Sequence, residues 1–169
     1  MKNEILEPYR MTIEEIWDNE HLHDMKNYIQ HRDLNCLEHS LFVSFKSYQV
    51  CRKIKCDEVA VARGALLHDF FLYDWHLERR SEKLHGFAHP EIALENAESH
   101  FTLSEVEKDI ILKHMWPLTL GKMPKYKESL IVSLIDKYCT AVELISPRTR
   151  AKIKKLAHTI SQKEPKPLP

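Results

Sequence analysis

The sequence predicts an all-α fold, a compact bundle of about six to seven helices, and three observations support this. Apolar residues recur at spacings of three and four along several segments, which is typical of helices with one buried side. No stretch shows the alternation of apolar and polar residues that a half-buried strand requires. The 169 residues include only three glycines, too few for a loop-rich β-sandwich.

The first half of the chain predicts three helices. One is expected over residues 12–31, because Thr12 is a good N-cap and Glu15 follows at the capping-box position. The next is expected over residues 36–55, where leucine and aromatic residues form a stripe at helical spacing. The third begins after Asp57, which can cap it, and its apolar run ends at a histidine-aspartate pair.

Two more helices are predicted in the middle of the chain. Residues 70–86 are rich in aromatic and charged residues and are expected to be irregular or partly helical. Pro90 suits the first turn of a helix that would run to about residue 100. Ser104 can cap a helix that would close near residue 114.

The last third of the chain predicts two helices and a tail. A helix over residues 129–145 has a wide apolar face, and a proline separates it from a basic helix over residues 148–160. We expect residues 1–163 to form one domain, because one core is normal for this length. Residues 164–169 are rich in proline and are expected to be a disordered tail.

Composition narrows the class of protein. Lysine plus arginine balances aspartate plus glutamate at 25 each, so no overall field would recruit a nucleic acid polymer or an anionic membrane. The apolar runs are shorter than the about 18 residues of a membrane span, and the N-terminus lacks a signal core. We therefore expect a cytoplasmic protein, with its oligomeric state open. The cysteines, which lack CxxC spacing, are expected to be buried thiols: Cys36, Cys51, Cys56 and Cys139.

Several histidines and aspartates stand where helices are otherwise apolar. His68 and Asp69 end an apolar helix, and Asp136 interrupts the strongest apolar stripe, where a carboxylate needs a partner. Together with three more histidines they form a set on separate elements: His39, His68, Asp69, His89, His114 and Asp136. A helical bundle can bring such a set to one centre. Imidazole and carboxylate ligands together suit divalent ions such as Fe, Mn, Co, Ni, Zn or Mg.

In this order, the six residues resemble the ligands of the HD superfamily of metal-dependent phosphohydrolases, most closely its members with six ligands and two metals. The resemblance covers residues 34–144 and implies an HD-domain-like helical fold. It implies a first metal site formed by His39, His68, Asp69 and Asp136. It implies a second site formed by His89 and His114, with Asp69 bridging the two metals.

The chain departs from the family pattern directly after the histidine-aspartate pair. Many members continue with Ile-Gly-Lys, and that lysine approaches the substrate phosphate, whereas this chain has Phe-Phe-Leu at residues 70–72. The substrate-binding role is therefore left to Lys83 or Arg63. His85 lies four residues before His89 and is expected to contact a phosphate or to protonate a leaving group.

The function expected from these residues is phosphate ester hydrolysis. We expect a phosphomonoesterase or phosphodiesterase that acts on a small phosphorylated substrate, with a nucleotide as the first choice. Water activated by one or two divalent ions, with Asp69 as a catalytic group, would make a side-chain nucleophile unnecessary. The sequence has no Gly-x-Ser-x-Gly elbow and no Walker-type glycine loop. Two alternatives remain: a diiron oxygenase that uses the same ligands, and a non-catalytic nucleotide-binding module.

Overall fold

The computed structural model describes residues 3–74 and 85–162. This part of the chain forms eight α-helices, one short 3-10 helix and a two-stranded hairpin, so the all-α prediction is confirmed, with more helices than expected. In chain order the elements are α1 (Asn3–Trp17), α2 (Glu20–Asp24), η1 (Met25–Asn27), β1 (Ile29–His31), β2 (Leu34–Asn35), α3 (Cys36–Ile54), α4 (Glu58–Leu66), α5 (His85–His100), α6 (Glu105–Lys113), α7 (Lys127–Ile145) and α8 (Pro147–Ser161).

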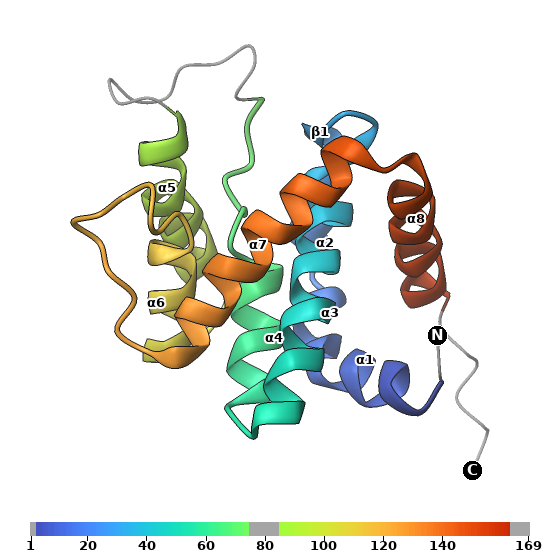
Figure 1. Ribbon diagram of the computed structural model, residues 1–169, viewed down its shortest axis with the longest axis horizontal. Helices are drawn as coiled ribbons and strands as arrows, with labels where there is room; N and C mark the ends of the chain where they lie inside the picture. The colour runs from blue at the N-terminus through green and yellow to red at the C-terminus, as the bar shows by residue number, and fades with distance from the viewer. Residues whose placement is uncertain (1–2, 75–84, 163–169) are drawn as a thin grey trace.

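The centre of the molecule is the pair α3 and α4, which pack against each other (Figure 1). Helices α5 and α6 lie on one side of this pair, and α8 lies on the other. Helix α7 crosses the arrangement and contacts α3, α4, α6 and α8. Because α7 touches both sides, side chains on its inner face can meet side chains from most of the other helices.

The N-terminal region differs from the single helix predicted over residues 12–31, and that prediction is wrong. Helix α1 begins earlier, so the Thr12 hydroxyl lies inside it and donates to the carbonyl of Pro8 (2.8 Å). A new helix starts after Asn19, whose side chain accepts the amide of His21 (2.9 Å). The hairpin of β1 and β2 was not predicted. Its tight turn has Arg32 in the left-handed region, at φ 59°.

Two of the three capping residues chosen from the sequence, Asp57 and Ser104, act as expected. Asp57 accepts the amide of Ala60 (2.9 Å) at the start of α4. Ser104 accepts the amide of Glu107 at the start of α6, and the Glu107 carboxylate accepts the Ser104 amide in return. Pro90, however, lies inside α5 rather than in its first turn, because that helix begins at residue 85.

The cysteines divide into two pairs. Cys36 and Cys139 are buried free thiols, as expected. Cys51 and Cys56 form a disulfide, so the prediction of free thiols is wrong for these two residues. The reason is local. Helix α3 ends at Ile54, the next residue Lys55 adopts the left-handed conformation, and the turn brings the Cα atoms of Cys51 and Cys56 to 5.1 Å.

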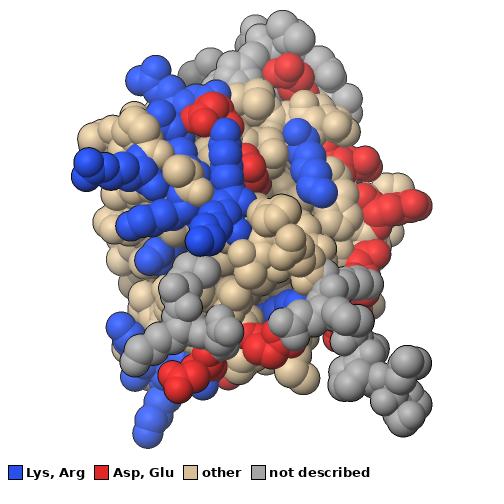
Figure 2. Space-filling model, turned by 90° about the vertical axis from the view of Figure 1, so that its right-hand side faces the viewer, with Lys and Arg blue, Asp and Glu red and all other residues tan. Residues whose placement is uncertain are grey.

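The last helix separates its apolar and basic residues cleanly. Ile153, Leu156 and Ile160 of α8 are buried against the core. Its basic side chains point outward, and lysine and arginine gather on the face of the molecule that α8 covers (Figure 2). Among the described helices, none combines the length and apolar character needed to cross a bilayer. The tail predicted over residues 164–169 lies outside the described residues.

Candidate metal centre

The structure brings the six predicted ligand residues to one buried place. His39 comes from the second turn of α3, His89 from α5 and Asp136 from the middle of α7. The remaining three follow the ends of helices, where α4 leads to His68 and Asp69 and α6 leads to His114. None of the six is more than 7% exposed. Residues that are 97 positions apart in the chain, such as His39 and Asp136, are in direct contact.

Asp69 lies between two groups of side chains, and each of its oxygens faces one group. Its Oδ2 atom is 3.3 Å from Nε2 of His68 and 3.8 Å from Nε2 of His39. Its Oδ1 atom is 3.2 Å from Nε2 of His89 and 3.5 Å from Nε2 of His114. A carboxylate with this arrangement can bridge two cations.

Asp136 completes the first of these groups. Its Oδ1 atom lies 3.2 Å from Nε2 of His39 and 3.7 Å from Nε2 of His68. In the second group the Nε2 atoms of His89 and His114 are only 2.8 Å apart. Two imidazoles that share so short a contact need a proton or a cation between their ring nitrogens.

Three of the histidines are oriented by acceptors on the outer side of the ring. Nδ1 of His68 donates to the carbonyl of Ala65 (2.8 Å), and Nδ1 of His114 donates to the carbonyl of Ile111 (2.8 Å). Nδ1 of His39 donates to the Glu143 carboxylate (2.8 Å). Because these partners only accept, each ring directs Nε2 inward, and outer partners of this kind are typical of metal-bound histidines.

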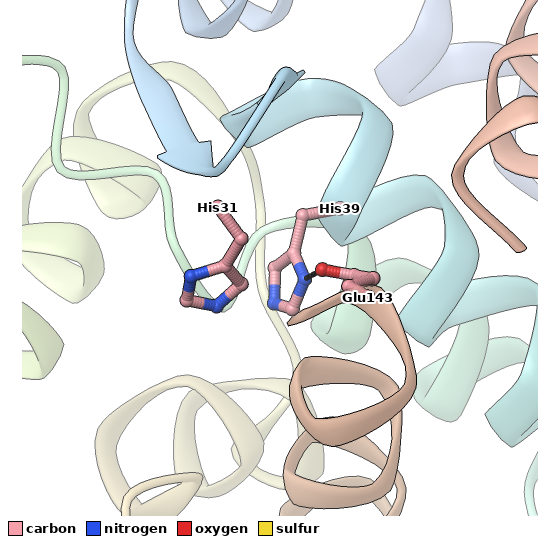
Figure 3. Close-up of side chains that lie close together, drawn as sticks. All are labelled: His31, His39 and Glu143. Carbon is pink, nitrogen blue, oxygen red and sulfur yellow. Dashed lines mark hydrogen bonds and ion pairs between the residues drawn. The ribbon is translucent and has the colours of Figure 1, made fainter. Parts of the chain in front are cut away.

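Figure 3 shows how Glu143 holds His39. The carboxylate comes from α7, one side of it meets Nδ1 of His39, and it is fully buried. His31, from β1, lies beside the His39 ring at 5.2 Å between centroids. His31, His39 and Glu143 could themselves hold an ion, but the Nδ1 proton of His39 occupies the space on the Glu143 side. We therefore assign Glu143 to orienting His39.

The two histidines of the first group have raised pKa values. Burial lowers the pKa of His39, but hydrogen bonds with Asp136 and Glu143 outweigh burial and hold this pKa well above its usual value. Burial also lowers the pKa of His68, and the charges of Asp69 and Asp136 raise it to about 9. Protons thus occupy positions that a divalent cation can take over, as metal binding to such ligands releases protons.

In the second group, by contrast, the pKa values of His114 and Asp69 are lowered. Burial, together with the neighbouring His68 and His89, keeps the pKa of His114 well below its usual value. Burial raises the pKa of Asp69, but His68 and His89 outweigh it and hold this pKa well below the usual range. A neutral imidazole and an ionised carboxylate are the forms that ligate a metal.

The donor set fits divalent ions on two further grounds. Nε2 of His68 and Oδ1 of Asp69 are buried, and neither has a hydrogen-bond partner among the described residues. Buried polar atoms without partners are costly, and a cation between them would satisfy both. The geometry divides the ligands into overlapping sets that could each hold an ion, and two of these are His39–His68–Asp69 and Asp69–His89–His114.

The centre opens into a cavity of about 730 Å³. Asp69, His89, His114 and Asp136 line its inner end. Three residues that the sequence analysis did not select also line it: Gln30, His31 and Lys137. The Gln30 side-chain amide donates to Oδ2 of Asp69 (2.6 Å), and the Lys137 ammonium donates to Asp136 (3.1 Å) and to the carbonyl of His114.

Arg63, predicted to bind substrate, is not brought to this cavity by the structure. Its guanidinium pairs with Glu107 (2.5 Å) and Glu15 (2.6 Å) and donates to the carbonyl of Thr102 (3.2 Å). Arg63 therefore ties α4 to α1 and α6, and we assign it this structural role instead.

Two other predicted site residues are not described. Lys83 lies outside the described residues. His85 is the first residue of α5, and its side chain is also outside the described part. Their roles stay predictions.

Comparison with known families agrees with this geometry. A family model described as the HD domain matches residues 36–141, which is more than half of the chain and includes all six ligand residues. No curated protein and no solved structure matches the chain.

Proposed function

Because this chain belongs to the HD domain family of metal-dependent phosphohydrolases, we propose that it hydrolyses a monoester or diester of phosphoric acid on a small molecule. The observation that carries this proposal is the placement of Asp69, whose two carboxylate oxygens face two separate groups of buried imidazole and carboxylate side chains. A centre of this kind suits two divalent ions that share one bridging ligand.

The ligands divide between the two ions as follows. His39, His68, Asp69 and Asp136 would hold the first, and Asp69, His89 and His114 would hold the second. Divalent ions at these positions would activate water and would stabilise the negative charge that develops on phosphate. Asp69 would hold both ions in place, which is the catalytic role proposed for it. Iron, manganese, cobalt, nickel, zinc and magnesium are all compatible with these donors.

Lys137 is the residue we propose for the phosphate contact that Arg63 does not make. Its side chain lines the cavity directly beside the ligand Asp136. An ammonium group has three donors, and two of them reach Asp136 and the His114 carbonyl, so one remains for a substrate oxygen. His85 and Lys83 are kept as further proposed contacts, with His85 protonating the leaving group.

The class of phosphate ester that serves as substrate is a separate part of the proposal. The nucleotide favoured by the sequence stays a prediction, and nucleotides enter the experiment as one class among several. Two alternative functions would use the same ligands: a diiron oxygenase and a non-catalytic nucleotide-binding module. The experiment that tests for hydrolysis also distinguishes both of them from a hydrolase.

The test begins with protein purified without chelator, its metal content measured, and each of the six metals added in turn. We expect phosphate release from at least one ester and no substrate-dependent oxygen uptake. Asp69→Ala is expected to lose both turnover and bound metal. Oxygen uptake without phosphate release, or tight nucleotide binding without turnover in every metal, would overturn the proposal.

Lys137→Gln separates phosphate binding from metal binding. We expect kcat/KM to fall by about 10–100-fold with metal content unchanged, because a charge-assisted contact to phosphate is lost. The matched control is Lys122→Gln, which removes a lysine that pairs with Glu91 and does not line the cavity. Equal activity in both variants would remove Lys137 from the site.

A further inference from the structure

We propose that the ester hydrolysed at this centre carries an apolar organic group, which lies against a group of apolar side chains in the same cavity. These side chains, called the apolar wall below, are those of Met115, Pro117, Leu118, Ala141 and Leu144. This inference rests on the proposed function, because it assumes that a phosphate group occupies the inner end of the cavity.

The apolar wall belongs to the same two segments that supply the metal ligands. Met115, Pro117 and Leu118 follow the ligand His114 along the chain. Ala141 and Leu144 lie further along α7 than the ligand Asp136. The wall is therefore fixed relative to the centre, and a molecule with its phosphate at the ligands would place its organic group against these side chains.

Two contacts hold the segment after α6 against α7. The Ser133 hydroxyl donates to the carbonyl of Trp116, and the Lys137 ammonium donates to the carbonyl of His114. Both donors are on α7. The two halves of the apolar wall thus form one surface.

Few polar side chains that could recognise a sugar or a base line the described cavity beside the candidate ligands, and these are Gln30, His31, Lys137 and Thr140. The Gln30 side chain is already engaged at both ends, since its amide nitrogen donates to Asp69 (2.6 Å) and its oxygen accepts from the Cys36 thiol (3.2 Å). Two of the three Lys137 donors are used as well. Along the apolar wall the Thr140 hydroxyl is the one polar side chain among the described lining residues of α7 beyond Lys137. A substrate group with several hydroxyls or amides placed there would lose water without gaining enough partners, which is unfavourable.

The side chains of the wall are also uncovered. Leu118 is 57% exposed and Leu144 is 44% exposed, although both line the cavity. An apolar group that covers them would remove apolar surface from water, which stabilises the complex. A cavity of about 730 Å³ lies within the range that takes small molecules, so there is room for a phosphate with a ring or a branched chain.

The experiment compares esters that share the phosphate and differ in the organic group. The probes are benzyl phosphate, glycerol 1-phosphate and adenosine 5′-monophosphate, each assayed with the metal that gives the highest activity. We expect kcat/KM for benzyl phosphate to exceed that for glycerol 1-phosphate by about tenfold or more. A preference for glycerol 1-phosphate or the nucleotide would overturn the inference while leaving phosphate ester hydrolysis intact.

A matched pair of variants locates the preference. Leu144→Asn changes the apolar wall and is expected to lower kcat/KM for benzyl phosphate by about 3–10-fold, with little change for glycerol 1-phosphate. Leu134→Asn is the control, because Leu134 is an exposed leucine of the same helix that does not line the cavity. Equal effects of the two variants on the substrate preference would contradict the assignment of the wall.

Binding measurements keep the inference testable if no ester is hydrolysed. Benzylphosphonate and 2,3-dihydroxypropylphosphonate, which are not cleaved, can be titrated calorimetrically into the metal-loaded protein. Tighter binding of benzylphosphonate, lost in Leu144→Asn, would support the apolar wall even though the proposed function had failed. Equal or weaker binding would overturn the inference.

Discussion

Individual side chains set the direction in which the histidines of the centre point. His39, His68 and His114 each use Nδ1 to donate to an acceptor that cannot donate back, so Nε2 is left for the interior. Two of these acceptors are backbone carbonyls three residues earlier, and only His39 relies on a side chain, Glu143. Replacing Glu143 therefore tests directly whether the acceptor for Nδ1 matters for metal binding.

Glu143→Leu is expected to weaken metal binding at the first site by about 10–100-fold, because His39 loses the partner that fixes its ring and tautomer. Glu143→Gln keeps an acceptor for Nδ1 and should lose less affinity. Isothermal titration with manganese measures both variants, with urea unfolding as a check on folding. Unchanged affinity in Glu143→Leu would show that the carboxylate is not needed for the site.

The six residues of the candidate centre could be selected from the sequence because each is a polar residue in an apolar helical pattern. Glu143 had the same signal, since it lies seven residues after Asp136 on the same buried side of α7. Gln30 and His31 gave no such signal. They reach the centre through the hairpin, which depends on the left-handed turn at Arg32 and has no alternating pattern in the sequence.

Among the elements, the contact of α4 with α6 governs how the two groups of ligands meet. Gly64 of α4 faces Ile110 of α6, and a Cβ atom on Gly64 would lie 3.0–3.1 Å from three atoms of the isoleucine side chain. The ends of the same two helices lead to His68 and Asp69 on one side and to His114 on the other. Close packing here keeps Asp69 near His114.

Gly64→Ala is expected to destabilise the fold by about 1–2 kcal/mol, because the clash with Ile110 exceeds the gain in helix propensity, which is about 1 kcal/mol. In an Ile110→Ala background the clash is absent, and the same change should be neutral or stabilising. Chemical denaturation of the four proteins gives the coupling between the two positions. Additive effects would mean that the helices do not touch at this point.

Asp109 of α6 holds the start of α7. Its carboxylate pairs with Lys113 (2.7 Å), accepts from the Ser129 hydroxyl (2.7 Å) and accepts the backbone amide of Lys125 (2.9 Å). Burial raises the pKa of Asp109, but Lys113, Ser129 and the amide outweigh it and lower this pKa below the ordinary 3.8. A lowered folded pKa means that the ionised carboxylate stabilises the fold above pH 3.8.

Asp109→Asn should therefore cost about 1–2 kcal/mol at pH 7, and the difference from the unchanged protein should shrink as the pH falls below about 4. Urea unfolding at several pH values measures this difference. Glu95→Gln, at an exposed position of α5, is the control and should show no such trend. A difference that stays constant down to pH 3 would exclude a role for the Asp109 charge.

Most helices were predicted correctly where a cap and an apolar stripe agreed, as at Asp57 and Ser104. The single helix predicted over residues 12–31 failed for a physical reason. The apolar residues there continue at helical spacing, but Asn19 caps a new helix and ends the old one. A capping residue inside a segment of helical periodicity favours the start of a second helix, whereas the periodicity favours one continuous helix. The sequence alone does not show which of the two forms.

For the molecule as a whole, the candidate metal centre brings together five separate parts of the chain. The proposed ligands come from α3, α5 and α7 and from the segments after α4 and α6. The family could be inferred from the sequence, and so could the six residues that the structure brings together. The apolar wall could not be inferred from the sequence, because its residues come from two segments whose proximity depends on the packing of α6 against α7.

Metal binding should stabilise the fold because it joins these parts. Ions present at about 100 times their dissociation constant would add about 2.7 kcal/mol, which corresponds to a rise in Tm on the order of 5–10 °C. Adding a chelator should reverse the rise. Asp69→Ala, which lacks the bridge, should show little change on chelation, and an equal change in both proteins would place the stabilising ion elsewhere.

The most direct test of a two-ion centre bridged by Asp69 is anomalous diffraction from a crystal grown with manganese. We expect two peaks per chain, one in bonding distance of His39, His68 and Asp136 and the other in bonding distance of His89 and His114, with Asp69 contacting both. A single peak, or peaks away from Asp69, would contradict the account.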